Sequence, residues 1–317
     1  MNTNPYPISK ILLPYDGSAS ARQALGLAAC LAQTGGPEVQ GLTLLHVTGG
    51  SYLARHVQNV DLRVTRLDQV KEWQRVRQHY LDSEILPLLE EAKQILLREG
   101  FEGLIELRVA EGKVSEQIAR LAREESFSTL IMGRRGLTPL KSFLLGSVTR
   151  KVLSLVEQMT VYVVGEETAP AEKCPPSPLL LPVDGSIPSL AAVRQAAALG
   201  RAFGPGELQL VLFHVVDIAL LTLSYQEGAD DLVQGGEEAL AAARVILQDA
   251  GLTGRWEEKL VSGHPARTIA QEAEAGNYRL IMMGSKGHSA LERIFLGSVT
   301  SYVVHRVTRP AVAVVYP

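Results

Sequence analysis

The sequence has few of the residues that build a disulfide scaffold or a metal site. Its 317 residues include only two cysteines, Cys30 within a helical pattern and Cys174 within a polar segment. Neither belongs to a CxxC pair, and no histidine cluster has the spacing of metal ligands. We therefore expect one cysteine to lie in the core and the other to be an exposed thiol, with no disulfide framework and no metal site.

The sequence also lacks long hydrophobic runs and a concentrated positive charge. No apolar stretch approaches the about 18 residues of a membrane span, and no basic segment followed by a long apolar run opens the chain. A net charge of -3 argues against nucleic acids or anionic membranes as partners, because these attract proteins through a basic face. These features predict a cytoplasmic protein without a nucleic-acid or membrane partner.

Apolar residues, in contrast, are plentiful, and they alternate with helical patterns. The hydrophobic fraction of 46% is enough for two buried cores, in line with about two domains of roughly 150 residues each. In the first half, short apolar runs that are typical of buried parallel strands alternate with amphipathic segments. These runs are 8–15, 41–48, 103–109, 128–132 and 161–164. Five strands alternating with helices predict a doubly wound α/β sheet.

The same pattern appears a second time after a proline-rich segment. Asp16 and Asp184 are separated by 168 positions, whereas Gly133 and Gly284 are separated by 151, so the first half carries 17 extra residues. This duplication predicts two tandem doubly wound, Rossmann-like domains, each with a five-stranded parallel sheet. The expected divisions are domain 1 at 1–165 with an extra helical region at about 51–80, a linker at 166–178, and domain 2 at 179–317. Within domain 1, Pro87 should kink or restart a helix.

One glycine pattern occurs in both halves, as GRRGLTPLKSFLLGS at 133–147 and as GSKGHSALERIFLGS at 284–298. In each, a glycine is followed after two residues by a second glycine and after nine more by Gly-Ser. Each pattern directly follows a predicted buried strand. Glycine lets the backbone approach a ligand closely, and a helix N-terminus offers unpaired N–H groups. The pattern therefore predicts a phosphate-binding loop that is present twice.

Two other features are expected to join each loop, because ligands of doubly wound sheets bind at the carboxyl ends of the strands. The Asp-Gly-Ser turn after the first strand offers Asp16 or Asp184 to a ribose or an adenine. The end of the second strand offers the backbone of Val47 or Val215 to the edge of a base. Together these groups describe a nucleotide site, although an Asp-Gly pair alone is more often a turn with a capping carboxylate.

The neighbouring histidines, His46 and His214, are expected to be satisfied strand-end residues rather than catalysts, since no partner acid or nucleophile is suggestively placed.

These residues resemble the universal stress protein family in its tandem two-domain form. The resemblance rests on the G-x2-G-x9-G-[S/T] spacing, on P-x-D-G-S after the first strand and on H-V in the second. It covers nearly the whole chain apart from the linker and residues 51–80. It implies an adenine-nucleotide-hydrolase-like fold, binding of ATP with or without Mg²⁺, and pairing of the two domains through their last strands. A further homodimer and an unknown regulatory protein partner stay open.

The resemblance also implies which residues contact the nucleotide. They are Pro14, Asp16, Val47, Met132, Gly133, Arg135, Gly136, Gly146, Ser147 and Val148 in the first half, and Pro182, Asp184, Val215, Met283, Gly284, Gly287, Gly297, Ser298 and Val299 in the second.

The chain departs from the family pattern at two places. Met159 stands where the second half has Pro310. The sheet edge formed by the last strand of the first half is therefore expected to differ in shape from the family pattern. Arg134 and Arg135 stand opposite Ser285 and Lys286, so the first loop either favours a more highly charged nucleotide or carries solvated arginines.

The expected function is a nucleotide-dependent regulator of the stress response with no hydrolysis or very slow hydrolysis. Two alternatives stay open, a weak ATPase and a structural interaction module with vestigial nucleotide sites. Neither loop has the GxxxxGK order of a P-loop ATPase, and the Asp-Gly-Ser turn differs from the SGGxDS loop of related ligases.

Overall fold

The computed structural model of the chain describes residues 7–49, 74–137, 145–168, 174–204, 206–223, 226–252, 254, 256–287 and 296–317. The first half contains β1 (Lys10–Pro14), α1 (Ala19–Gly35), η1 (Gly36–Glu38), β2 (Gly41–Thr48), η2 (Leu81–Ile85), α4 (Leu86–Arg98), β3 (Ile105–Glu111), α5 (Val114–Glu124), β4 (Thr129–Gly133), α6 (Ser147–Leu153) and β5 (Thr160–Val164). The second half contains β6 (Leu179–Pro182), α7 (Ile187–Phe203), β7 (Leu210–Asp217), α8 (Ile218–Leu223), α9 (Gln226–Asp249), β8 (Trp256–Gly263), α10 (Pro265–Ala275), β9 (Leu280–Gly284), α11 (Ser298–Arg306) and β10 (Ala311–Val315). Strands and helices alternate as the sequence predicts.

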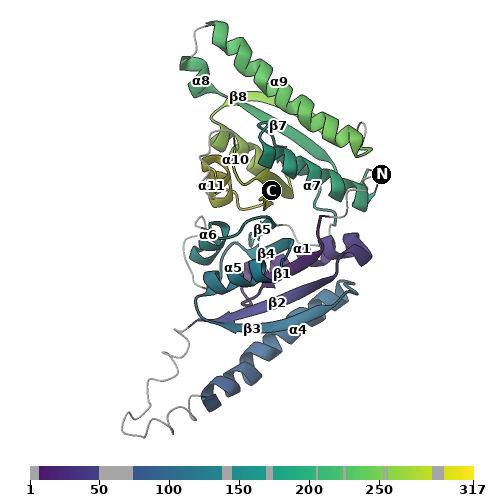
Figure 1. Cartoon of the computed structure of the whole chain (residues 1–317), viewed down its shortest axis with the longest axis vertical. Coiled ribbons are helices and arrows are strands. Elements are labelled where there is room, and N and C mark those ends of the chain that lie inside the picture. The colour runs from purple at the N-terminus through teal and green to yellow at the C-terminus, as the bar shows by residue number, and fades with distance from the viewer. Residues whose placement is uncertain are drawn as a thin grey trace.

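The strands form one ten-stranded sheet in the order β3-β2-β1-β4-β5-β10-β9-β6-β7-β8. Figure 1 shows its outermost strands, β3 beside α4 and β8 beside α9. Neighbouring strands within each half are parallel. The two halves meet where β5 and β10 pair antiparallel, with Val312 opposite Val163 and Val315 opposite Thr160. The doubly wound α/β fold is therefore confirmed, and so is the expected pairing of the two halves through their last strands.

Both alanine-rich helices begin at a serine cap directly after the first strand of each half. The Ser18 hydroxyl accepts a hydrogen bond from the Ala21 N–H at 3.3 Å, and the Ser186 hydroxyl accepts one from the Ser189 N–H at 3.3 Å. These bonds satisfy backbone donors that have no partner within the helix. Alanines let α1 approach the sheet closely, and Ala24 and Ala28 are completely buried.

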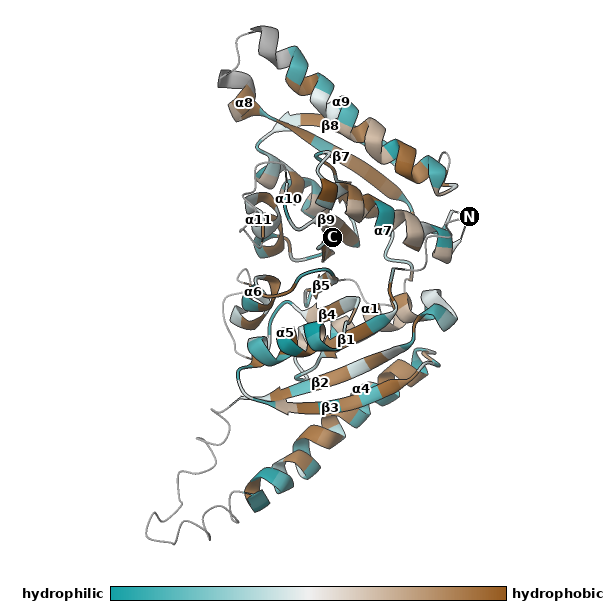
Figure 2. Ribbon diagram, in the orientation of Figure 1, coloured by the Kyte–Doolittle hydropathy of each residue, from teal (hydrophilic) through white to brown (hydrophobic). Residues whose placement is uncertain are grey.

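The buried side chains form two clusters, one on each face of the sheet, and each cluster runs through both halves. The first contains residues of α1, α4, α7 and α9, and the second contains residues of α5, α6, α10 and α11. Figure 2 shows hydrophobic residues along β2, β3 and β7 and mixed colouring along α4 and α9. The expectation of a separate core for each half is therefore corrected, because the shared sheet makes both faces continuous.

Polar bonds accompany the pairing of β5 with β10. The Gln195 side chain of α7 accepts a bond from the Thr160 hydroxyl at 2.6 Å and donates one to the Tyr162 hydroxyl at 3.3 Å. Complete burial raises the pKa of Tyr162. The Tyr316 N–H donates to the Met159 carbonyl at 2.9 Å, which extends the pairing beyond β10. The edge of the sheet is therefore intact in the first half, although Met159 stands there in the place that corresponds to Pro310 of the second half.

Pro87 lies in the first turn of α4, directly after the π-helical turn η2. Proline has no N–H to give to a preceding carbonyl, and its ring crowds the turn before it. A wider turn at Leu81–Ile85 is consistent with that constraint, and the residues on either side, Tyr80 and Leu86, keep a helical backbone. The irregularity predicted at Pro87 is therefore a wider turn within a continuing helix. Residues 74–80 are helical, and the remainder of the predicted extra region lies outside the described residues. None of the described helices is long and apolar enough to cross a bilayer.

One cysteine, Cys30, is buried as expected, but the prediction of an exposed thiol and no disulfide is wrong. Cys30 of α1 and Cys174, which precedes β6, form a disulfide across a sequence separation of 144 residues. A pairing over this distance cannot be read from spacing, because it depends on where the chain re-enters the sheet after the linker. The bond ties the first helix of one half to the entry of the other.

Replacing Cys174 with alanine should lower the free energy of unfolding by roughly 2–4 kcal/mol relative to the oxidised protein. The disulfide closes a long segment and so reduces the conformational entropy of the unfolded chain. Denaturant unfolding of both proteins, each with and without a reductant, measures the effect. Reductant should bring the unsubstituted protein to the level of Cys174→Ala and leave the variant unchanged. Equal stability under all four conditions would contradict the prediction.

Candidate functional site

The predicted site residues gather at one point of each half, where the strand order reverses. From β1 the chain proceeds outward through β2 to β3 and then returns to β4 on the opposite side of β1. The carboxyl ends of β1, β2 and β4 are therefore neighbours, and ligands of doubly wound folds bind at such a point. Asp16 follows β1, Val47 lies near the end of β2, and Gly133 ends β4. β6, β7 and β9 repeat this arrangement.

The first glycine of each pattern packs against the start of a helix. A Cβ atom at Gly133 would lie 2.6 Å from the Ser20 hydroxyl oxygen and 2.9 Å from the Ala21 nitrogen. At Gly284 it would lie 2.5 Å from the carbonyl carbon of Pro188. Distances this short exclude any side chain at either position. The first glycine is therefore required for the contact between the strand end and the helix, whatever the loop binds.

The second glycine of each pattern lies against the carboxylate of the Asp-Gly-Ser turn. A Cβ atom at Gly136 would stand 2.6 Å from Oδ2 of Asp16, and one at Gly287 would stand 2.4 Å from Oδ2 of Asp184. In each half the other oxygen, Oδ1, accepts the N–H of the serine two residues later at 3.0 Å. Each carboxylate therefore supports its turn with Oδ1 and presents Oδ2 to the loop. The turn and the ligand interpretations of these residues are compatible.

The end of the second strand extends beyond the last residue that pairs with β1. The Leu45 carbonyl accepts the Tyr15 N–H at 2.8 Å, while the Thr48 carbonyl accepts the Gly112 N–H on the β3 side at 3.1 Å. Because backbone groups alternate in direction along a strand, those of Val47 face the same side as those of Leu45. β1 has ended at that level. The backbone of Val47 therefore faces the side of β1, beyond the end of that strand.

The third element is the start of the helix that follows each loop. The Gly146 N–H donates to the Arg134 carbonyl at 3.0 Å, and the Thr149 hydroxyl donates to the Gly133 carbonyl at 3.0 Å. In the second half, the Gly297 N–H donates to the Ser285 carbonyl at 2.7 Å. The Thr300 hydroxyl donates to the Gly284 carbonyl at 2.8 Å.

These bonds hold the helix starts at Ser147 and Ser298 beside the strand ends, with first-turn N–H groups that have no partner within the helix. Residues 138–144 and 288–295, in the middle of the two patterns, lie outside the described residues. Sequence reasoning does not single out Thr149 and Thr300, although the Ser-Val-Thr that follows both loops is a signal for them.

The two histidines beside the site are structural, as expected. Nδ1 of His46 lies 2.9 Å from the Tyr15 carbonyl, and Nδ1 of His214 lies 2.7 Å from the Val183 carbonyl. Each ring thereby joins the end of the second strand to the residue that follows the first. Burial lowers the pKa of His46 below its ordinary value.

The solvated alternative is wrong for Arg134, because its side chain is buried and binds the other half of the chain. It is 5% exposed, and its guanidinium donates to the Val304 carbonyl at 2.7 Å. Two further donations go to the carbonyls of Val307 and His305, at the end of α11 in the other half. Arg135 is fixed through its backbone, whose carbonyl accepts the Ser20 hydroxyl at 2.5 Å.

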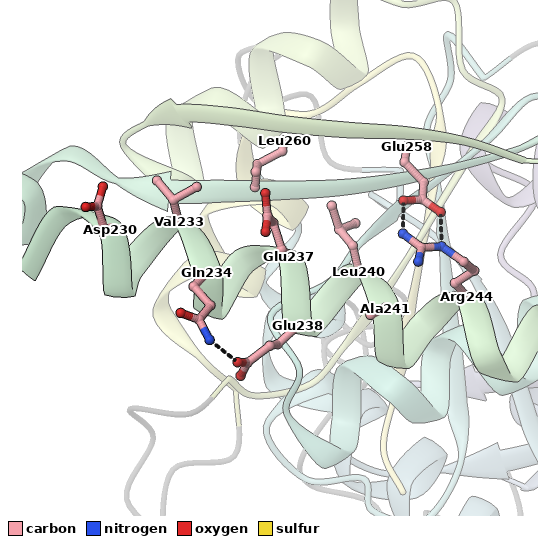
Figure 3. Close-up of a pocket in the computed structure, with 10 residues that line it drawn as sticks. All are labelled: Asp230, Val233, Gln234, Glu237, Glu238, Leu240, Ala241, Arg244, Glu258 and Leu260. Atoms are coloured by element: carbon pink, nitrogen blue, oxygen red, sulfur yellow. Dashed lines mark hydrogen bonds and ion pairs between the residues drawn. The ribbon is translucent and has the colours of Figure 1, made fainter.

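A cavity elsewhere in the second half is unsuited to a phosphate. It lies between α9 and β8, and Figure 3 shows the side chains that line it. Four of these are carboxylates, Asp230, Glu237, Glu238 and Glu258, and the single arginine, Arg244, is already paired with Glu258 at 2.8 Å. The excess negative charge would repel an anion. The two loops are therefore the better candidates for nucleotide sites.

The fold and the two loops define a tandem, doubly wound α/β protein with a matched glycine loop in each half. The model of the universal stress protein family matches residues 7–164 and again residues 177–315. The chain belongs to the universal stress protein family.

Similar proteins and structures carry the same family name. A universal stress protein of Methanocaldococcus jannaschii is 30% identical over 144 residues, which is 44% of this chain and 82% of that protein. A universal stress protein of Bacillus subtilis is 30% identical over 158 residues, which is 46% of this chain and 93% of that protein. The crystal structure of a universal stress protein from Archaeoglobus fulgidus covers 96% of this chain and 97% of its own, with a TM-score of 0.64 and 22% identity. A likeness at that identity establishes the fold.

The burial of His46 should make the folded state sensitive to acid. Its pKa is lower in the folded than in the unfolded state, so the unfolded state binds more protons as the pH falls below about 6.5. Stability should therefore be present above that pH and be lost as the pH falls. In His46→Asn, the amide can still donate to the Tyr15 carbonyl but does not titrate. Denaturant unfolding between pH 7.5 and 5.5 should show a smaller loss for this variant, and equal losses would contradict the prediction.

Proposed function

We propose that this protein binds ATP, with or without Mg²⁺, at both loops and acts as a nucleotide-dependent regulator of the stress response. The observation that carries the proposal is the repeated contact of a turn carboxylate with the second glycine of the loop, Asp16 with Gly136 and Asp184 with Gly287. Three chain segments that are distant in sequence meet in the same geometry in both halves. Conservation of such a detail between two copies is expected of a functional site.

The division of roles within each site follows from chemistry. Asp16 and the Val47 backbone would hold the nucleoside, since a carboxylate accepts from ribose hydroxyls and a backbone edge pairs with a base. The loop glycines and the helix start at Ser147 would hold the phosphates through N–H groups and the positive end of the helix dipole. The proposed contacts also include Pro14, Met132, Gly133, Arg135, Gly136, Gly146 and Val148 in the first half, and Pro182, Asp184, Val215, Met283, Gly284, Gly287, Gly297, Ser298 and Val299 in the second.

We propose slow hydrolysis or none, because neither loop carries the lysine and following hydroxyl of a P-loop. A weak ATPase and a structural module with vestigial sites are the alternatives. The proposal also includes two domains, at 1–165 and 179–317, and a cytoplasmic location. It further includes a homodimer and a regulatory protein partner. In a cytoplasm, the Cys30–Cys174 bond would have to persist against the reducing glutathione pool.

Valine at the second glycine of a loop should abolish nucleotide binding at that loop. Among the described residues, the added Cβ meets only the flexible end of the aspartate carboxylate, so the fold should tolerate it. Native mass measurement in ATP should show two bound nucleotides for the unsubstituted protein, one for Gly136→Val or Gly287→Val, and none for the double variant.

The control is Leu104→Ala, an exposed position at the opposite end of the sheet, which should retain both nucleotides. Unsubstituted protein that binds no ATP at millimolar concentration would overturn the proposal and favour the vestigial module. Binding followed by steady phosphate release would favour the weak ATPase.

A further inference from the structure

The side chain of Arg134 leaves its own loop and binds the end of a helix in the other half. Its guanidinium donates to the Val304 carbonyl at 2.7 Å and also to the carbonyls of Val307 and His305. These carbonyls belong to the last turn of α11 and the residue that follows it, where backbone acceptors have no partner within the helix. Arg134 is therefore a C-terminal cap provided by the opposite half.

The opposite end of α11 is the proposed phosphate end of the second site. The helix has only 9 residues and begins at Ser298. At that end, Gly297 and Thr300 bond to the carbonyls of Ser285 and Gly284 in the second loop. A helix of this length behaves as a short rigid rod of about 1.5 Å per residue. Displacement of its C-terminal end would therefore move the N–H groups at Ser298.

The cap is specific to one half of the duplication. Ser285 occupies the position that corresponds to Arg134, and its side chain is too short to reach across. The end of α6 is bound instead by the Tyr316 hydroxyl, which donates to the Leu153 carbonyl at 2.6 Å. A charged group thus holds the helix of the second site, whereas a neutral hydroxyl holds that of the first.

Burial of this guanidinium is costly and must be compensated. Nε of Arg134 has no hydrogen-bond partner among the described residues. The compensation comes from the three backbone acceptors, from the negative end of the helix dipole and from the charge of the Glu274 carboxylate. Burial lowers the pKa of Arg134 to about 10, which leaves the cap charged at neutral pH.

We propose that Arg134 is a positioning residue for the second nucleotide site, because its side chain fixes the helix whose first turn binds the phosphates there. The inference rests on the proposed function. Its consequence is a crossed dependence, in which a residue of the first loop controls affinity at the second.

The test uses full-length protein in the Gly136→Val background, which leaves only the second site to bind ATP. Adding Arg134→Met should weaken ATP binding about 10-fold or more, because three acceptors lose a charged donor. Arg134→Lys should restore part of the affinity. It can also be measured in place of Arg134→Met if that variant does not fold. Tyr316→Phe is the matched control, since it removes the cap of α6 and leaves α11 untouched, and it should change affinity less than 2-fold. Circular dichroism checks that each variant is folded.

Three outcomes would overturn the inference. Affinity at the second site that is unchanged in a folded Arg134→Met protein removes the positioning role; where that variant does not fold, unchanged affinity in Arg134→Lys does so. Equal weakening by Tyr316→Phe indicates a general loss of stability instead. Absence of ATP binding by the unsubstituted protein overturns the proposed function itself. The first two outcomes differ from this one, because in both of them the Gly136→Val protein still binds ATP.

Discussion

The antiparallel pairing of β5 with β10 is the contact on which the rest of the molecule depends. Both strands are fully buried and rich in valine. In a separate half, each would be a flat apolar edge with unpaired backbone groups, which favours aggregation. Pairing satisfies these groups, joins two five-stranded sheets into one and makes both hydrophobic layers continuous. The halves are therefore expected to fold and remain stable as one unit.

Much of the fold was predictable because its signals are local. Apolar runs predicted the strands, serine and glycine marked the helix starts, and the duplicated spacing predicted a second copy of each feature. The meeting of Asp16 with Gly136 was also predictable, although 120 residues separate them in sequence. It follows from the general rule that ligand sites form where the strand order of a doubly wound sheet reverses.

The features that sequence could not predict are long-range contacts whose partners carry no signal of their own. From the sequence, Arg134 is expected to add positive charge to the first loop or to be solvated, because it stands opposite Ser285 of the second loop. Its partners are backbone carbonyls, which every residue possesses, so no pattern of residue types reveals them. The disulfide of Cys30 with Cys174 was hidden for a similar reason, since only the path of the chain after the linker brings the two thiols together.

The two loops show how a duplicated site can diverge without losing its geometry. The constraints common to both copies act on the backbone: the first glycine must contact a helix start, and the second must leave room for a carboxylate. The residues between the glycines are free of these constraints, since Arg134 and Ser285 have side chains of different size and charge while their carbonyls accept the same bond. Side chains at such positions can change with little effect on their own loop. Arg134 has accordingly become part of the contact between the halves, and the family spacing is preserved around it.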